Sequence, residues 1–186
     1  MLVLGLLLAC LAQDFPDLGT RKNGVDWPGF LGPRHDGTSP EKGLVAPWPS
    51  AGPRIVWQAE LGESYAACSI LKGRLFIFDR QGDRMRLLCL KSETGEELWR
   101  QEYESSYRDG YGAGNGPRCC PVADADRVYT FDPAGQLRQF AGVQSLHNGC
   151  QLLYTPGSAC SESLLSFVGR PDSRQASVPR VGDALD

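Results

Sequence analysis

Two adjacent cysteines, Cys119 and Cys120, are the residues with the clearest capacity for chemistry, and they stand in the stretch Gly-Pro-Arg-Cys-Cys-Pro-Val. A reactive thiolate needs electropositive surroundings, and only Arg118 supplies a positive charge nearby. Cysteine also behaves as a small hydrophobic residue that packs well in an interior. We therefore interpret the pair as packing residues at the start of a strand.

A glycine-rich stretch, Gly110–Gly116 (GYGAGNG), resembles a loop that cradles phosphate groups. Such a loop must leave a strand and open a helix, so that the N-terminus of the helix faces the phosphate. This stretch runs instead into Pro117 and then into a segment typical of a strand. We expect a connecting loop whose glycines need positive φ angles.

The histidines and the remaining cysteines lack the partners that metal or hydrolytic sites need. His35 and His147 are the only histidines, and the chain has no Gly-x-Ser-x-Gly motif. The seven cysteines include no Cys-x-x-Cys pair, which argues against a zinc ribbon. If Cys10 belongs to an N-terminal leader, six cysteines remain, and the sequence leaves their pairing open.

Several acidic residues have structural rather than catalytic interpretations. Asp79 and Asp132 each follow a phenylalanine at equivalent positions of a repeat, and a catalytic residue is normally unique, so we expect both to cap turns. Glu93, Glu96 and Glu97 are typical of the solvated side of a hairpin. We predict no catalytic, cofactor-binding or metal-ligating residues.

The elements that carry these residues are predicted to be short strands. The 186 residues are 41% hydrophobic and include 22 glycines and 13 prolines, and no long segment keeps an apolar period of 3.6 residues. This composition favours one modest all-β domain with many turns. The net charge is −3 and the basic residues are scattered, which argues against a nucleic-acid partner.

An internal repeat gives this all-β domain its organisation. Arg74–Gly82 (RLFIFDRQG) aligns without a gap with Arg127–Gly135 (RVYTFDPAG), 53 residues further on, and Trp57 recurs as Trp99 after 42 residues. Repeats of four short strands run to about 40–50 residues. An insertion at Tyr107–Pro117 accounts for the longer spacing of the second unit.

The hairpin pattern in Leu87–Trp99 (LLCLKSETGEELW) resembles that of a known family. It predicts a strand, a tight turn at Thr94-Gly95 and a second strand that begins at Leu98-Trp99. The order apolar–Leu–x–x–x–Thr–Gly–x–x–x–Trp closely resembles the repeat of the PQQ-like (quinoprotein) β-propeller family. The resemblance implies four-stranded blades with Trp99 docked on a neighbouring blade. Lys91 departs from the acidic residue that is usual after the leucine.

Residues 15–54 are predicted to form an irregular lead-in in which Trp27, Phe30 and Trp48 pack onto a face of the domain. X-Pro steps hold such a chain extended, and each proline removes a hydrogen-bond donor. The stretches DWPGFLGPRHDGTSP and APWPSAGPRIVW are similar to the lead-in of exported PQQ-like propeller proteins common in planctomycete-type bacteria.

Residues 1–14 resemble an export signal because Met1–Ala12 is a continuous apolar run that is too short to span a bilayer. The basic region that normally precedes such a run is missing, and the first positive charge is Arg21. Leu7-Leu8-Ala9-Cys10 resembles a lipobox, which would make Cys10 a lipid anchor. The alternatives are cleavage after Ala12 and a buried N-terminal strand.

Residues 55–140 are predicted to hold two blades, and residues 141–186 to be a tail of low order. No tryptophan follows Trp99, and the Ser-rich end cannot bury enough surface to offset its ordering entropy. A frameshift would replace a third unit in this way, and a natural disordered tail is the alternative. Two blades cannot close a ring, so we expect an incomplete propeller with an open sheet edge.

The resemblance implies a function, although fold analogy alone is a weak basis for one. The first hypothesis is a non-enzymatic binding or scaffold module of the cell envelope or periplasm, with a protein partner and no cofactor. Its glycine-rich loop Gly110–Gly116 could line an opening where propellers bind ligands. The second is a fragment of a dehydrogenase that uses PQQ with calcium, in which a disulfide such as Cys119-Cys120 would lie over the quinone.

Overall fold

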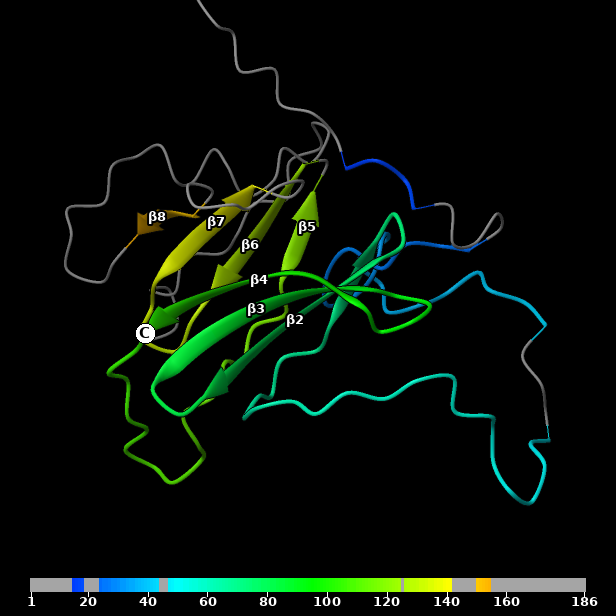
Figure 1. Ribbon diagram of the computed structural model, residues 1–186, viewed down its shortest axis with the longest axis horizontal. Helices are drawn as coiled ribbons and strands as arrows, with labels where there is room; N and C mark the ends of the chain where they lie inside the picture. The colour runs from blue at the N-terminus through cyan, green and yellow to red at the C-terminus, as the bar shows by residue number, and fades with distance from the viewer. Residues whose placement is uncertain (1–14, 19–23, 44–46, 125, 142–149, 155–186) are drawn as a thin grey trace, which may run out of the picture. The chain divides into compact units, whose positions relative to one another are not determined.

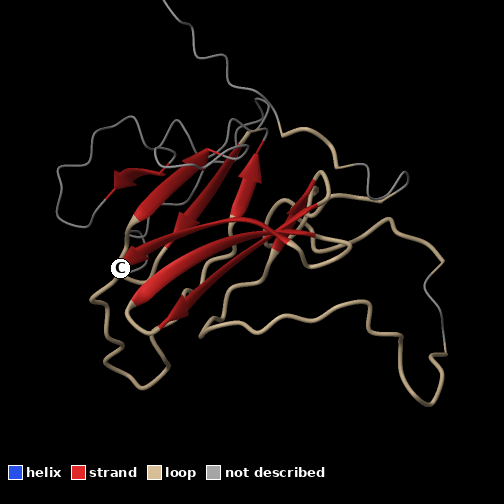
Figure 2. Ribbon diagram, in the orientation of Figure 1, coloured by secondary structure: helices blue, strands red, loops and turns tan. Residues whose placement is uncertain are grey.

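Eight β-strands and no helix make up the part of the chain that the computed structural model describes, residues 15–18, 24–43, 47–124, 126–141 and 150–154 (Figures 1 and 2). They form two four-stranded antiparallel sheets, each in sequential order. The strands are β1 (Ser69–Leu71), β2 (Arg74–Gln81), β3 (Arg84–Lys91), β4 (Glu97–Glu104), β5 (Val122–Asp124), β6 (Arg127–Phe131), β7 (Leu137–Ala141) and β8 (Cys150–Tyr154). This arrangement confirms the predicted all-β partial propeller.

The first sheet is built around the long hairpin of β2 and β3, which pair from Arg74↔Lys91 to Gln81↔Arg84. Nearly every residue of these two strands is buried, because both faces of the sheet are covered. One face presents Phe76, Phe78, Met85, Leu87 and Cys89. The other face presents Leu75, Ile77, Leu88 and Leu90.

The first of these faces shares a core with the second sheet, through Ala123, Val128 and Phe140. The lead-in adds Phe15, which is 1% exposed and whose ring centroid lies 5.7 Å from that of Phe76. The shared core joins the two repeats because neither sheet could bury its apolar face alone.

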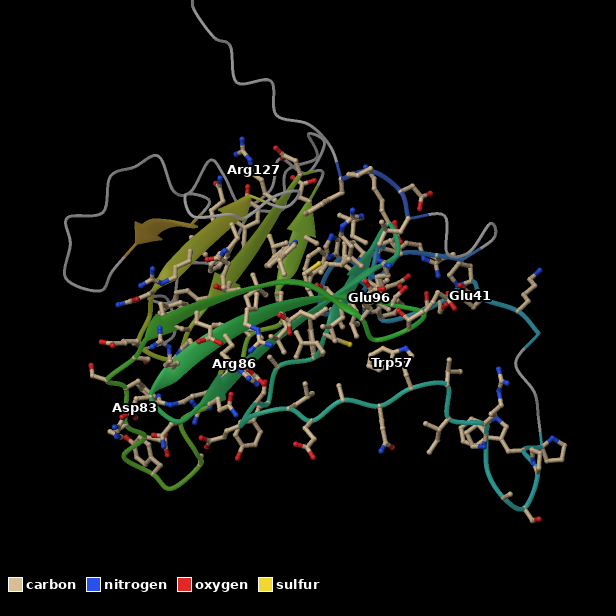
Figure 3. All side chains as sticks on the ribbon, viewed as in Figure 1. Glu41, Trp57, Asp83, Arg86, Glu96 and Arg127 are labelled. Carbon is tan, nitrogen blue, oxygen red and sulfur yellow. The ribbon has the colours of Figure 1, made fainter. Side chains whose placement is uncertain are left out.

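The opposite face of the first sheet is covered by Trp57, which comes from the extended segment before β1. The indole Nε1–H donates to the backbone oxygen of Ser92 at 2.9 Å, in the turn between β3 and β4. Figure 3 shows Trp57 beside the hairpin that carries Glu96. Gly95 has a φ of +71° and lets the ring approach closely, since a Cβ there would lie 2.6 Å from Trp57 Cε3. The predicted Thr94-Gly95 hairpin is therefore confirmed, and a tryptophan packs on its turn.

Gly95→Ala is expected to lower the free energy of unfolding by about 2–4 kcal/mol, because it adds both a positive-φ penalty and a clash with Trp57. The control is Gly82→Ala at the β2–β3 turn, where φ is +59° and no atom lies within 4 Å of the added Cβ. That change should cost about 1 kcal/mol. Urea unfolding followed by tryptophan fluorescence measures both values, and equal losses would contradict the close approach.

Trp99, at the start of β4, packs against the shared core, as its place in the hairpin predicts. Its ring centroid lies 6.0 Å from that of Phe76, with the planes tilted by 47°. Tyr103 follows on the same side of β4, and its hydroxyl donates to Asp132 Oδ2 of the second sheet at 2.9 Å. Burial raises the pKa of Tyr103, which keeps this hydroxyl protonated as a donor.

The two Phe-Asp motifs of the repeat have different roles, although their sequences align. Asp132 caps the β6–β7 turn as predicted, because its Oδ1 accepts the backbone N–H of Gln136 at 2.9 Å. Asp79 does not cap a turn, and that prediction is wrong. The hairpin of the first sheet continues past Asp79, which lies opposite Arg86 and binds its guanidinium through both oxygens, at 2.9 and 2.6 Å.

The second sheet continues beyond Phe140, where the sequence places the end of the repeats. β8 (Cys150–Tyr154) pairs with β7, from Leu137↔Tyr154 to Phe140↔Cys150, and gives this sheet its fourth strand. The strand was missed because it lacks the Thr-Gly turn and the tryptophan that mark the first unit.

Of the three aromatic residues of the lead-in that are predicted to pack on the domain, two do not do so. Phe30 is 70% exposed and Trp48 65% exposed, so the prediction is wrong for both. Trp27 does join the domain, because its backbone N–H and C=O exchange hydrogen bonds with Ile70 of β1 at 2.8 and 2.7 Å. The residue that reaches the core is Phe15, which no motif indicated.

Several predictions lie outside the described residues. These are the export signal in residues 1–14, the anchor at Cys10, and the tail beyond residue 154 with its frameshift hypothesis. Among the described residues, no helix has the length and hydropathy needed to span a membrane.

Candidate functional site

The insertion Tyr107–Pro117, which we call the insert loop, connects β4 to β5 and is held by a buried arginine of β2. Arg80 is 3% exposed. Its guanidinium donates to four backbone oxygens and one carboxylate: Gly82 (2.7 Å), Ser105 (3.1 Å), Tyr107 (3.1 Å), Asn115 (3.4 Å) and Asp83 (3.3 Å). These contacts fix both ends of the insert loop to the hairpin of the first sheet, beside Asp83 in Figure 3.

A second set of hydrogen bonds, around Asp109, sets the internal conformation of the insert loop. Asp109 Oδ2 accepts the backbone N–H groups of Tyr111 (3.1 Å) and Ala113 (2.6 Å). The Asp109 N–H in turn donates to Asn115 Oδ1 at 2.8 Å. The hydrogen bond from Ala113 is the main reason why the pKa of Asp109 lies below its usual value. The loop is therefore preorganised by its own side chains.

Two glycines of the insert loop adopt positive φ angles, as the sequence predicts, and a third allows a close approach of the backbone. Gly112 and Gly114 have φ angles of +75° and +90°. Gly116 lies against the extended segment before β1, where a Cβ would come 2.4 Å from the backbone oxygen of Glu63. The loop leads into β5 rather than into a helix, so the phosphate-loop interpretation is excluded.

The insert loop and its neighbours expose three aromatic side chains, two of which lie near Arg118. Tyr111 is 97% exposed, and Tyr65 is 63% exposed with the Arg118 guanidinium 5.9 Å from its ring centroid. Arg118 also donates to the backbone oxygen of Gly114 at 3.1 Å and lines a shallow pocket of about 250 Å³ with Phe131. We call Tyr65, Tyr111, Arg118 and Phe131 the loop face.

The loop face has the composition of a binding surface. Aromatic residues and arginine are enriched in protein interfaces, where they supply large contact areas and several donors. The anchor points of the insert loop could not be found from sequence, because Arg80 and Glu63 reach this loop only through tertiary contacts. The one available signal was the pair of charged residues, Asp79 and Arg80, directly after the apolar run of β2.

The adjacent cysteines are both free thiols that face different neighbours. Cys119 is exposed and lines the shallow pocket beside Phe131. Cys120 Sγ lies 3.6 Å from the backbone oxygen of Cys68, and burial raises its pKa to about 11. A raised pKa opposes thiolate formation, so Cys120 is not an activated nucleophile.

The other candidates also have structural surroundings. His35 has a φ of +56° and lies in the turns of the lead-in, and His147 lies outside the described residues. Glu93, Glu96 and Glu97 are exposed as predicted, and Glu96 pairs with Lys91 at 2.5 Å.

The two aspartates of the repeat, Asp79 and Asp132, are already engaged by protein donors. Asp79 uses both oxygens on Arg86, and its Oδ2 also accepts the Gly62 N–H at 2.7 Å. Asp132 accepts hydrogen bonds from Gln136 and Tyr103. Within the described ranges no three His, Cys, Asp or Glu side chains form a group that could hold a metal. These residues therefore do not fit the calcium that a PQQ enzyme needs.

A comparison with known proteins finds a partial relative. Over 83 residues the chain is 36% identical to the outer membrane protein assembly factor BamB of Nitrosomonas eutropha. The match covers 43% of this chain but only 19% of that protein. No family model and no solved structure matches the chain. With the two four-stranded sheets, the match supports a relationship to the PQQ-like repeats, and it lends no support to a planctomycete source.

Proposed function

We propose that this chain is a non-enzymatic protein-binding module of the cell envelope, located in the periplasm and working without a cofactor. The observation that carries the proposal is the insert loop, which Arg80 and Asp109 hold in one conformation while Tyr111 stays 97% exposed. A preorganised loop loses little conformational entropy on binding, and an exposed tyrosine offers a large, rigid contact.

The chemistry of the loop face favours a protein partner. Arg118 is held by Asp109 and by the Gly114 carbonyl, so it can present its remaining donors between Tyr65 and Phe131. Such an arrangement suits a peptide segment with an aromatic or acidic side chain. The relative named as an outer membrane protein assembly factor supports a role in assembling envelope proteins. A lipid anchor at Cys10 would hold the module at a membrane surface.

Photo-crosslinking from the loop face tests this function. With p-benzoylphenylalanine in place of Tyr111, we expect one discrete protein adduct in the envelope of the source bacterium. The same probe at Ile55, which is 72% exposed on the extended segment, is the control and should give at least tenfold less adduct. Tyr111→Ala should weaken binding of the identified partner roughly 30-fold, or about 2 kcal/mol. Equal labelling at both positions would contradict a specific role for the loop face.

Incubation with PQQ and calcium tests the absence of a cofactor. We expect no stoichiometric absorbance band and no dye reduction with alcohols, because Asp79 and Asp132 are already engaged by protein donors. A saturable band at one quinone per chain would favour the dehydrogenase alternative.

A further inference from the structure

Three cysteines gather where the two sheets meet, just before β1 and β5. Cys68 precedes β1, Cys119 and Cys120 precede β5, and β1 and β5 lie next to each other. We propose that Cys68 and Cys120 form a disulfide that links the two sheets when the protein meets an oxidising compartment. The bond would form whether or not the loop face binds a protein.

The segments that carry these two cysteines run side by side in the same direction. The Asn115 N–H donates to Glu63 Oε1 at 2.6 Å, and the Tyr65 N–H donates to the backbone oxygen of Pro117 at 2.9 Å. The offset of 52 residues found at Glu63 and Asn115 recurs at Cys68 and Cys120. The two cysteines are thus at matching positions of neighbouring chains.

The spacing of such chains fits a disulfide. Hydrogen-bonded extended segments lie about 5 Å apart, and disulfides join residues whose Cα atoms are about 4.4–6.8 Å apart. Cys120 Sγ already lies 3.6 Å from the backbone oxygen of Cys68. Because the Cys68 side chain is exposed, its rotation is the movement that we expect to bring the two sulfurs together.

Cys119 is a poorer partner for either residue. Successive side chains of an extended chain point to opposite sides, and Cys119 lines the shallow pocket with Phe131 and Pro133. A bond between Cys119 and Cys120 would close a small ring around one peptide bond and force it out of its planar trans form.

The bond forms by thiol–disulfide exchange with a protein or small-molecule disulfide as the oxidant. Cys68, the exposed thiol, attacks one sulfur of the oxidant, releases its first thiol and forms a mixed disulfide. Cys120 then loses its proton to solvent, and its sulfur attacks Cys68 Sγ and releases the second thiol. The two protein thiols give up two electrons and two protons, and the oxidant becomes two thiols.

The test uses the full chain, purified reduced and then incubated with oxidised glutathione. Trypsin separates Ile55–Lys72, which holds Cys68, from Cys119–Arg127, which holds the adjacent pair. Mass spectrometry without reduction should find these two peptides joined. They should remain joined in Cys119→Ser, and the product should be lost in Cys68→Ser and in Cys120→Ser.

The free energy of unfolding provides a second readout, which the destabilising effect of a serine substitution does not affect. Each protein is unfolded in urea in its oxidised and its reduced form, so that any cost of the serine itself cancels. Oxidation should lower the unfolding equilibrium constant about 1000-fold in the wild type and in Cys119→Ser, because the bond closes a loop of some 50 residues. A disulfide from Cys119 to Cys68 or to Cys120 would overturn the proposal. It would also be overturned if Cys68 and Cys120 could still be alkylated under conditions that oxidise other thiols of the chain.

Discussion

Asp79→Ala is expected to lower the free energy of unfolding by about 3–5 kcal/mol, the largest loss among the charged residues of the first sheet. Asp79 is fully buried and binds the Arg86 guanidinium through both oxygens. Alanine would leave that guanidinium, whose residue is 8% exposed, without its carboxylate, and would also remove the acceptor of the Gly62 N–H. The loss comes mainly from the unpaired charge that remains.

Urea unfolding gives the value, and two variants show its origin. Arg100→Ala breaks an exposed ion pair with Glu97 on β4 and should cost less than about 1 kcal/mol. Replacing Asp79 and Arg86 together, with leucine and methionine, should recover most of the stability because neither partner of the pair is then left as an unpaired buried charge. If the double variant is as unstable as Asp79→Ala, the packing of Asp79 rather than its charge would be responsible.

Asp79 shows why the sequence repeat could be predicted although the role of this residue within the repeat could not. Asp79 and Asp132 occupy equivalent places in the aligned sequences, yet the first hairpin continues for two more residue pairs beyond Asp79. The second hairpin ends at Phe131↔Leu137, so Asp132 is left at the turn. Hairpin length depends on the returning strand, and only β3 supplies an arginine opposite the carboxylate.

The elements were predictable where local residues determine them. Thr94-Gly95 marks a hairpin through turn chemistry, and the dense apolar residues of β2 indicate a strand covered on both faces. Phe15 could not be placed in the core, because it lies far from Phe76 in the sequence and belongs to no periodic pattern. β8 was missed for a related reason, since only its pairing with β7 identifies it.

The position of the insert loop could be predicted from the sequence, but its fixed conformation could not. The insertion Tyr107–Pro117 stood out because it interrupts the repeat. Its fixed conformation depends on Glu63 and Arg80, which approach it only after the first sheet has formed. Polar residues that act over such distances carry no local signature, so the sequence predicted only a connecting loop with glycines at positive φ angles.

Arg80→Met should show how far the insert loop depends on this buried contact. Methionine keeps much of the side-chain volume but removes every donor, so the Ser105 oxygen loses the hydrogen bond from Arg80 and the Tyr107 oxygen keeps only the one from the exposed Arg108. We expect a loss of about 3–4 kcal/mol in the free energy of unfolding. Chymotrypsin should also cut the loop at Tyr107 or Tyr111 at least tenfold faster, since proteases cleave loops that open locally.

Arg108→Met is the matched control, because Arg108 contacts the same loop from its exposed side. It donates to the Tyr107 oxygen and pairs with Asp83, both at 2.9 Å, yet its side chain is 59% exposed. Solvent replaces such contacts, so stability should fall by less than about 1 kcal/mol and the cleavage rate should change little. Chymotrypsin could cut the insert loop of Arg80→Met quickly while this variant still binds the crosslinked partner normally. That result would show that binding through Tyr111 does not depend on the preorganisation of the loop. Weakened binding in Arg80→Met but not in Arg108→Met would connect the buried guanidinium to recognition, although neither arginine belongs to the loop face.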